Sequence, residues 1–138
     1  MTGADVSEVE ISFDRDRIDF AATSAIIKAS YWGAQRSDEI HRCAFDNSLC
    51  VSAFIDGEQV GFARAVTDHA CFAYLCDVIV WPERRGVGIG KKLVGALLDH
   101  PDLAQVGSWS LRTTDAHSLY AGFGFEVSND GFWMRRRR

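Results

Sequence analysis

The stretch that decides the fold is Arg85-Gly86-Val87-Gly88-Ile89-Gly90-Lys91-Lys92. It follows an apolar run typical of a buried strand, Phe72 to Trp81, and precedes an amphipathic run, Leu93 to Leu98. A glycine-rich turn that opens a helix presents backbone N–H groups without intrahelical acceptors, and the helix dipole adds to their attraction for anions. The glycines also let the backbone approach a ligand closely. The junction therefore predicts a phosphate-binding turn.

The spacing of the glycines excludes two common phosphate-binding motifs. A P-loop with Gly90-Lys91 as its Gly-Lys pair would begin with glycine at the position of Arg85, and Lys92 stands where Ser or Thr should hold magnesium. The dinucleotide fingerprint G-x-G-x-x-G fails as well. Its third glycine would fall on Lys91 or on Leu93, depending on which glycine begins the motif.

The spacing that remains is Arg85-x-x-Gly88-x-Gly90. It resembles the Arg/Gln-x-x-Gly-x-Gly/Ala signature of the GNAT superfamily of acyl-CoA-dependent N-acyltransferases, although glycines at such a junction can also be plain turn residues. A second block, from Leu111 to Phe125 with Leu119-Tyr120 in its middle, is similar to the GNAT element in which a short helix carries Leu-Tyr and Gly-Phe closes it. The resemblance extends from Val60 to Val127 and departs from the commoner pattern at Thr113, where many members carry Asn.

The resemblance implies acetyl-CoA as co-substrate, with the pyrophosphate of coenzyme A on the backbone amides of the glycine turn. Basic side chains beside the turn would neutralise its charge, although they also suit a solvated helix start. The pantetheine arm would pair with the end of the preceding strand as a short extra strand does. The implied cofactor-binding residues are Val78, Ile79, Val80, Arg84, Arg85, Gly86, Val87, Gly88, Ile89, Gly90, Lys91 and Lys92.

Two residues are implied to be catalytic. Tyr120 matches the family's tyrosine near the coenzyme A sulfur and would protonate the leaving thiolate; a core tyrosine packed on the sheet is the alternative. Asp77 lies in the apolar strand, where alternation places it on one face with Leu75, Ile79 and Trp81. Burying an unpaired carboxylate is costly, so a buried aspartate usually has a charged or hydrogen-bonding partner or a chemical role. It would either deprotonate the acceptor ammonium, directly or through water, or serve as a hydrogen-bonding strut.

The acceptor site is implied to lie where the first two helices connect. Tyr31 and Trp32 would form an aromatic wall suited to a cationic amine, or would cover the core. Arg36 could instead hold a carboxylate of an amino-acid-like acceptor.

Composition limits the class of protein. The 138 residues suit a single domain, with residues 1–8 and 135–138 as flexible tails. No run is long and apolar enough to span a bilayer, and no signal peptide opens the chain, so we expect a cytoplasmic protein without a membrane partner. The net charge of −4 would be −8 without Arg135 to Arg138, which argues against a nucleic-acid partner. Four cysteines lack zinc or dithiol spacing, and we expect no metal.

The pattern of apolar, turn and capping residues also predicts the helices and strands. We expect an α+β (mixed α/β) fold of three layers, in which helices flank a mixed, mostly antiparallel, twisted sheet of about six to seven strands. Helices are expected at 18–31, 37–45, 89–99 and 116–121. Strands are expected at 9–13, 48–55, 59–66, 71–81, 108–113, 125–128 and 132–134.

The function expected from the resemblance is transfer of an acetyl group from acetyl-CoA to a primary amine of a small molecule or peptide, by direct attack in a ternary complex. The alternative is a catalytically silent module that binds acyl-CoA or a protein partner on the same fold. The family resemblance also makes a homodimer possible.

Overall fold

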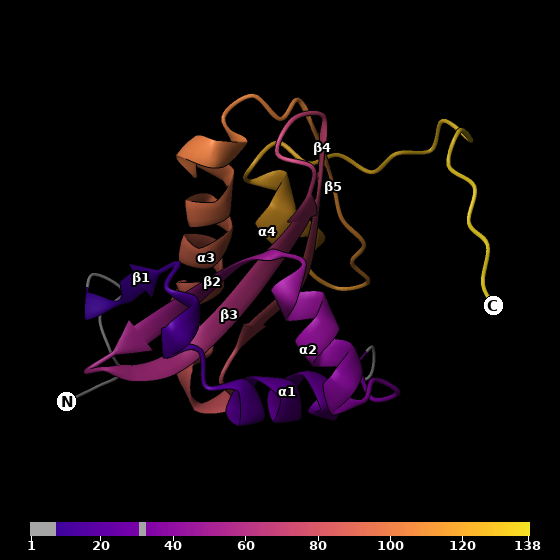
Figure 1. Ribbon diagram of the computed structural model, residues 1–138. Helices are drawn as coiled ribbons and strands as arrows, with labels where there is room; N and C mark the ends of the chain where they lie inside the picture. The colour runs from indigo at the N-terminus through magenta and orange to yellow at the C-terminus, as the bar shows by residue number, and fades with distance from the viewer. Residues whose placement is uncertain (1–7, 31–32) are drawn as a thin grey trace.

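A five-stranded sheet forms the centre of the computed structural model, which describes residues 8–30 and 33–138 (Figure 1). The strands follow one another in chain order across the sheet. The first three pairings are antiparallel, and the last pairing is parallel. The strands are β1 (Glu10–Ser12), β2 (Leu49–Ile55), β3 (Glu58–Thr67), β4 (Phe72–Val80) and β5 (Ser108–Ser110).

Helices cover both faces of this sheet, as predicted (Figure 1). Ser37 caps α2, as expected, by accepting a hydrogen bond from the Ile40 N–H at 3.2 Å. None of the helices among the described residues is long and apolar enough to cross a membrane. The α-helices are α1 (Phe20–Ala29), α2 (Asp38–Asp46), α3 (Ile89–Leu98) and α4 (His117–Ala121), and short 3-10 helices are η2 (Arg15–Arg17), η3 (Pro82–Arg84) and η4 (Pro101–Leu103).

Two apolar clusters hold the layers together. On one face, α3 places Ile89, Leu93 and Leu97 against small and branched side chains of the central strands. On the other face, Ile27 of α1 and Phe45 of α2 meet the sheet. Close packing of buried side chains makes the position of α3 rigid relative to β4, so the glycine turn between them has a fixed place.

A bulge in β4 changes which side chains face which layer. Phe62 pairs with Ile79 and Arg64 pairs with Cys76, so two residues of β4 lie opposite one residue of β3. Asp77, with φ of +53°, lies in this bulge. Leu75 therefore packs on the α3 side and Ile79 on the α1/α2 side. The prediction that strict alternation places Asp77 on one face with both Leu75 and Ile79 was wrong, because the inserted residue reverses the alternation.

The predicted closing strands at 125–128 and 132–134 are absent, so the described sheet has five strands rather than six or seven. Beyond α4 the chain runs away from the sheet in an extended path (Figure 1). A strand needs a neighbouring strand with which to exchange backbone hydrogen bonds, and the sequence pattern alone does not show whether one is present. The strand predicted at 108–113 likewise ends at Ser110, where its pairing with β4 stops.

Candidate functional site

The start of α3 is an open backbone site. Gly86 and Gly88 both have φ of +88°, a left-handed conformation that glycine adopts without steric cost. Gly88 caps the helix but has no side chain to satisfy the first helical amides, which have no intrahelical acceptors. A Cβ added at Gly86 would meet no atom within 4 Å, so this side of the turn is open. The turn has the geometry that an anion at a helix N-terminus requires.

Positive charge surrounds this turn. Arg85 and Lys91 are exposed, whereas Arg84 and Lys92 are half-buried. The described residues provide no ion-pair partner for any of these four side chains. The Arg85 Nε–H donates to the Val80 carbonyl at 3.1 Å, which fixes one side of the guanidinium against the end of β4. The cations thus add electrostatic attraction for an anionic ligand.

The second half of β4 has an open edge on its β5 side. β5 pairs only with Phe72, Ala73 and Tyr74, although β4 continues to Val80. From Leu75 onward, the described residues offer no strand partner on that side. Unpaired peptide groups at a sheet edge accept an added extended segment. Val78 and Val80 pack against the same cluster as Ile89 at the start of α3, so this open edge runs toward the glycine turn.

Asp77 is the centre of a buried ion-pair network. The Arg36 Nη1–H donates to both of its carboxylate oxygens at 2.8 and 2.9 Å, and the Arg64 Nε–H donates to Oδ2 at 2.7 Å. The Asp77 side chain is fully buried, and Arg64 extends the network to the Ser48 hydroxyl at 2.8 Å. Two guanidinium groups therefore already engage the oxygens that would receive a proton. This geometry favours the strut interpretation of Asp77.

Tyr120 lies on α4 and packs against the cluster on the α3 side of the sheet, which includes Val78 and Val80. Its ring meets Phe125 edge to face, with 6.0 Å between the ring centroids. Burial, and to a lesser extent Asp115, raises the pKa of the Tyr120 phenol. The phenol is thus neutral at physiological pH and carries a proton to donate.

A polar network between α1 and α2 was not predicted. The Ser24 hydroxyl donates to Asp38 Oδ1 at 2.8 Å and lies 2.7 Å from His41 Nδ1. Because the single hydroxyl proton points to Asp38, the ring Nδ1–H of His41 must donate to Ser24. The Nε2 atom then carries a lone pair, is buried, and has no hydrogen-bond partner. The spacing of His41 and Phe45 on one helical face was the available sequence signal, and it indicated only burial.

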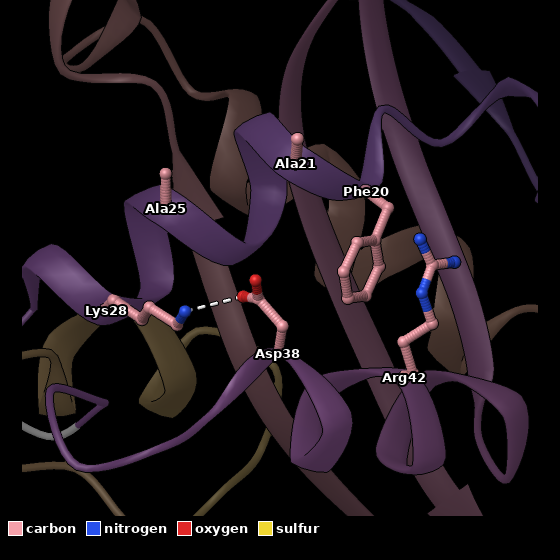
Figure 2. A pocket seen from close by; sticks show the side chains of 6 residues that line it. All are labelled: Phe20, Ala21, Ala25, Lys28, Asp38 and Arg42. Carbon is pink, nitrogen blue, oxygen red and sulfur yellow. Dashed lines mark hydrogen bonds and ion pairs between the residues drawn. The ribbon is translucent and has the colours of Figure 1, made fainter.

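The hollow between α1 and α2 is separate from the glycine turn (Figure 2). Figure 2 shows Lys28 pointing to Asp38 across it and Arg42 lying beside the Phe20 ring. The other lining residues are Ala21 and Ala25, so α1 and α2 supply the whole lining, and none of the predicted cofactor residues contributes.

The predicted site residues thus fall into groups. The glycine turn, the end of β4 and Tyr120 lie around one face, whereas Asp77 and Arg36 meet in the ion-pair network on the α1/α2 side. Tyr31 and Trp32, the expected aromatic wall, lie outside the described residues. Within the described ranges, no cluster of three or more His, Cys, Asp or Glu side chains could hold a metal ion.

Comparison with known proteins assigns the family. The model of the GNAT acetyltransferase domain matches residues 46–127, which include the glycine turn and Tyr120. The chain belongs to the GNAT acetyltransferase family. A solved structure from Xanthomonas campestris pv. campestris, described as a GNAT-family acetyltransferase, is 39% identical and has a TM-score of 0.89. The match covers 94% of this chain and 93% of that one.

Curated relatives share the family over part of their length. An uncharacterized N-acetyltransferase from Pyropia yezoensis is 30% identical over 105 residues, which is 69% of this chain and 60% of that protein. The chloroplastic GCN5-related N-acetyltransferase 2 of Arabidopsis thaliana is 37% identical over 89 residues, or 56% of this chain and 34% of that protein. The chain therefore spans between about a third and three fifths of these relatives.

The buried imidazole predicts a specific pH dependence of stability. Burial, followed by the positive charge of Arg36, lowers the pKa of His41 from 6.5; Lys28 acts in the same direction, and Asp77 and Asp38 oppose it. Between the folded-state pKa of His41 and 6.5, the unfolded chain therefore binds more protons than the folded chain. The free energy of unfolding falls as the pH is lowered through this range. A single titrating group changes the free energy of unfolding by at most about 1.4 kcal/mol per pH unit.

Urea unfolding at pH values between about 7.5 and 5 measures this slope. We expect His41→Gln to lose stability less steeply over that range than the unsubstituted protein, whatever its absolute stability. His117→Gln, at an exposed position, is the matched control and should keep the original slope. Equal slopes for His41→Gln and the unsubstituted protein would show that the buried imidazole is not the titrating group.

Proposed function

We propose that this protein is an acetyl-CoA-dependent N-acetyltransferase that acetylates a primary amine of a small-molecule or peptide acceptor by direct attack in a ternary complex. The observation that carries the proposal is the uncapped start of α3, with left-handed Gly86 and Gly88, next to the unpaired half of β4. Among structures with the same fold, an aminoglycoside N-acetyltransferase in complex with CoA has a TM-score of 0.69 at 18% identity.

The donor half of the site follows from this backbone geometry. The amides at the start of α3 would hold the pyrophosphate of acetyl-CoA, and Arg84, Arg85, Lys91 and Lys92 would balance its charge. The open edge at Val78–Val80 would hold the extended pantetheine arm by backbone hydrogen bonds. An amide of β4 would then stabilise negative charge on the thioester oxygen as the amine attacks.

Proton transfers complete the reaction. As the carbon–sulfur bond breaks, the neutral Tyr120 phenol would donate its proton to the leaving thiolate and regain one from solvent. Water would take the proton that the attacking ammonium loses, since guanidinium groups engage both oxygens of Asp77. In this assignment Asp77 is a positioning residue, which links Arg36 of the α1–α2 connection to Arg64 of β3.

The direct test is binding and turnover with the full chain. Saturating acetyl-CoA should raise Tm, because a ligand that binds only the folded state stabilises it, and a broad panel of primary amines should include one that gives coenzyme A release above background. Binding without release on every amine would support the silent acyl-CoA-binding alternative. If acetyl-CoA gives no thermal shift and no amine gives coenzyme A release, both the acetyltransferase and the acyl-CoA-binding functions are excluded.

Removal of one hydroxyl group tests the role of Tyr120. With any amine found active, Tyr120→Phe should lower kcat by about tenfold to a hundredfold while the Kd for acetyl-CoA changes little. Tyr74→Phe is the matched control, since Tyr74 is also partly buried but lies where β4 pairs with β5. An unchanged kcat in Tyr120→Phe would remove the acid role and leave Tyr120 as a packing residue.

A further inference from the structure

The buried ion-pair network around Asp77 carries a net positive charge. Two guanidinium groups, those of Arg36 and Arg64, engage a single carboxylate, which leaves one positive charge unbalanced. The exposed fractions of the three side chains are 29% for Arg36, 10% for Arg64 and 0% for Asp77. Arg36 is therefore the member of the network that a ligand in solution reaches first.

The titratable side chains near this network leave the excess charge in place. Burial raises the pKa of the Cys50 and Cys76 thiols to about 11, so both are neutral at physiological pH. Burial, followed by the positive charge of Arg36, lowers the pKa of His41, so the imidazole is neutral as well. Two further ion pairs near these groups are each neutral overall, Arg15–Asp46 and Lys28–Asp38. Within the described part of the chain, the region therefore keeps a net charge of +1.

The proposed position of acetyl-CoA brings the thioester to this network. With its pyrophosphate at the glycine turn, the cofactor would extend its pantetheine arm along the open edge of β4, from Val80 back toward Val78. The next residue along this edge is Asp77, in the bulge. The thioester is at the far end of the arm, so it would lie beside the bulge.

The amine would approach this thioester from the α1/α2 side of the sheet. On the other side, Tyr120 packs together with Val78 and Val80 on the apolar cluster that faces α3, and there it would serve the leaving thiolate. The α1/α2 side holds Asp77 and its two guanidinium groups. The attacking amine, and whatever groups it carries, would thus lie next to Arg36.

We propose that the acceptor is an amine that also carries a carboxylate, as an amino acid does, and that the carboxylate lies beside Arg36. One carboxylate balances the single excess charge, which a phosphate dianion would exceed and a second cation on the acceptor would increase. A planar guanidinium also suits a carboxylate in geometry. The nearby positive charge would further favour loss of the ammonium proton to water. This substrate class rests on the acetyltransferase function proposed above.

Matched pairs of amines that differ only in a carboxylate test the proposal. Coenzyme A release is measured with phenylalanine and phenethylamine, with leucine and isoamylamine, and with the polyamine spermidine. In at least one pair we expect kcat/KM to be about tenfold or more higher for the amino acid, and spermidine should be a poor acceptor. Titration calorimetry of the same compounds into the coenzyme A-saturated protein measures binding without turnover and should give the same order of affinity.

Substitution of Arg36 tests its assignment. Arg36→Gln should lower kcat/KM for the preferred amino acid by about tenfold or more and leave that for the decarboxylated partner nearly unchanged. Arg36→Lys keeps the charge without the planar fork and should restore part of the preference. Arg42→Gln, at an exposed arginine that lies over the Phe20 ring, is the matched control and should keep the full preference. A thermal shift with acetyl-CoA shows that each variant is folded and binds the donor.

The results separate the substrate class from the function on which it rests. Equal turnover within each pair, faster turnover of the decarboxylated amine or of spermidine, or a folded Arg36→Gln variant that keeps the preference overturns the carboxylate assignment and leaves the acetyltransferase function standing. Amino acids that bind with the expected preference but release no coenzyme A support the assignment and overturn the activity. If no compound binds and none gives coenzyme A release, both proposals are overturned.

Discussion

The bulge of β4, held by the buried carboxylate of Asp77, is the constraint on which the rest of the site depends. Asp77 lies there with a positive φ, and Arg64 from β3 and Arg36 from the α1–α2 connection engage its oxygens. A buried carboxylate costs several kcal/mol unless it is paired, so Asp77 requires the guanidinium groups that engage it. The network joins three parts of the chain at the point where the alternation of β4 reverses.

The reversal connects this ion-pair network to the side of the sheet on which α3 packs. Before the bulge, Ala73 and Leu75 face α3, and after it Val78 and Val80 do so. β5 pairs with β4 only before the bulge, and the later half of β4, which runs toward the glycine turn, has no strand partner on that side among the described residues. The same part of β4 therefore places Asp77 on the α1/α2 face of the sheet and has an edge without a strand partner. Regular pairing throughout β4 would provide neither.

Much of this could be predicted from the sequence, because local signals decide it. The glycine spacing at Gly86, Gly88 and Gly90 predicted the open start of α3, and apolar patterns, helix-capping residues and the Leu-Tyr block predicted the α-helices and strands of the described residues. Alternation alone could not place the bulge at Asp77, since it cannot show where one strand gains a residue against another. The network of His41 was missed because a lone histidine on an apolar face indicates burial, while its partners Ser24 and Asp38 come from different helices. The closing strands at 125–128 and 132–134 were wrong for a third reason, which is that pairing depends on a neighbour.

Backbone amide NMR shows where acetyl-CoA binds, because the proposed contacts are made by peptide groups rather than side chains. On titration of acetyl-CoA into the 15N-labelled protein, we expect the largest chemical-shift changes at residues 86–92 and 78–80, the glycine turn and the open edge of β4. Saturable binding that instead shifts the amides around the hollow between α1 and α2, with those of the glycine turn unchanged, would show that the glycine turn does not bind acetyl-CoA.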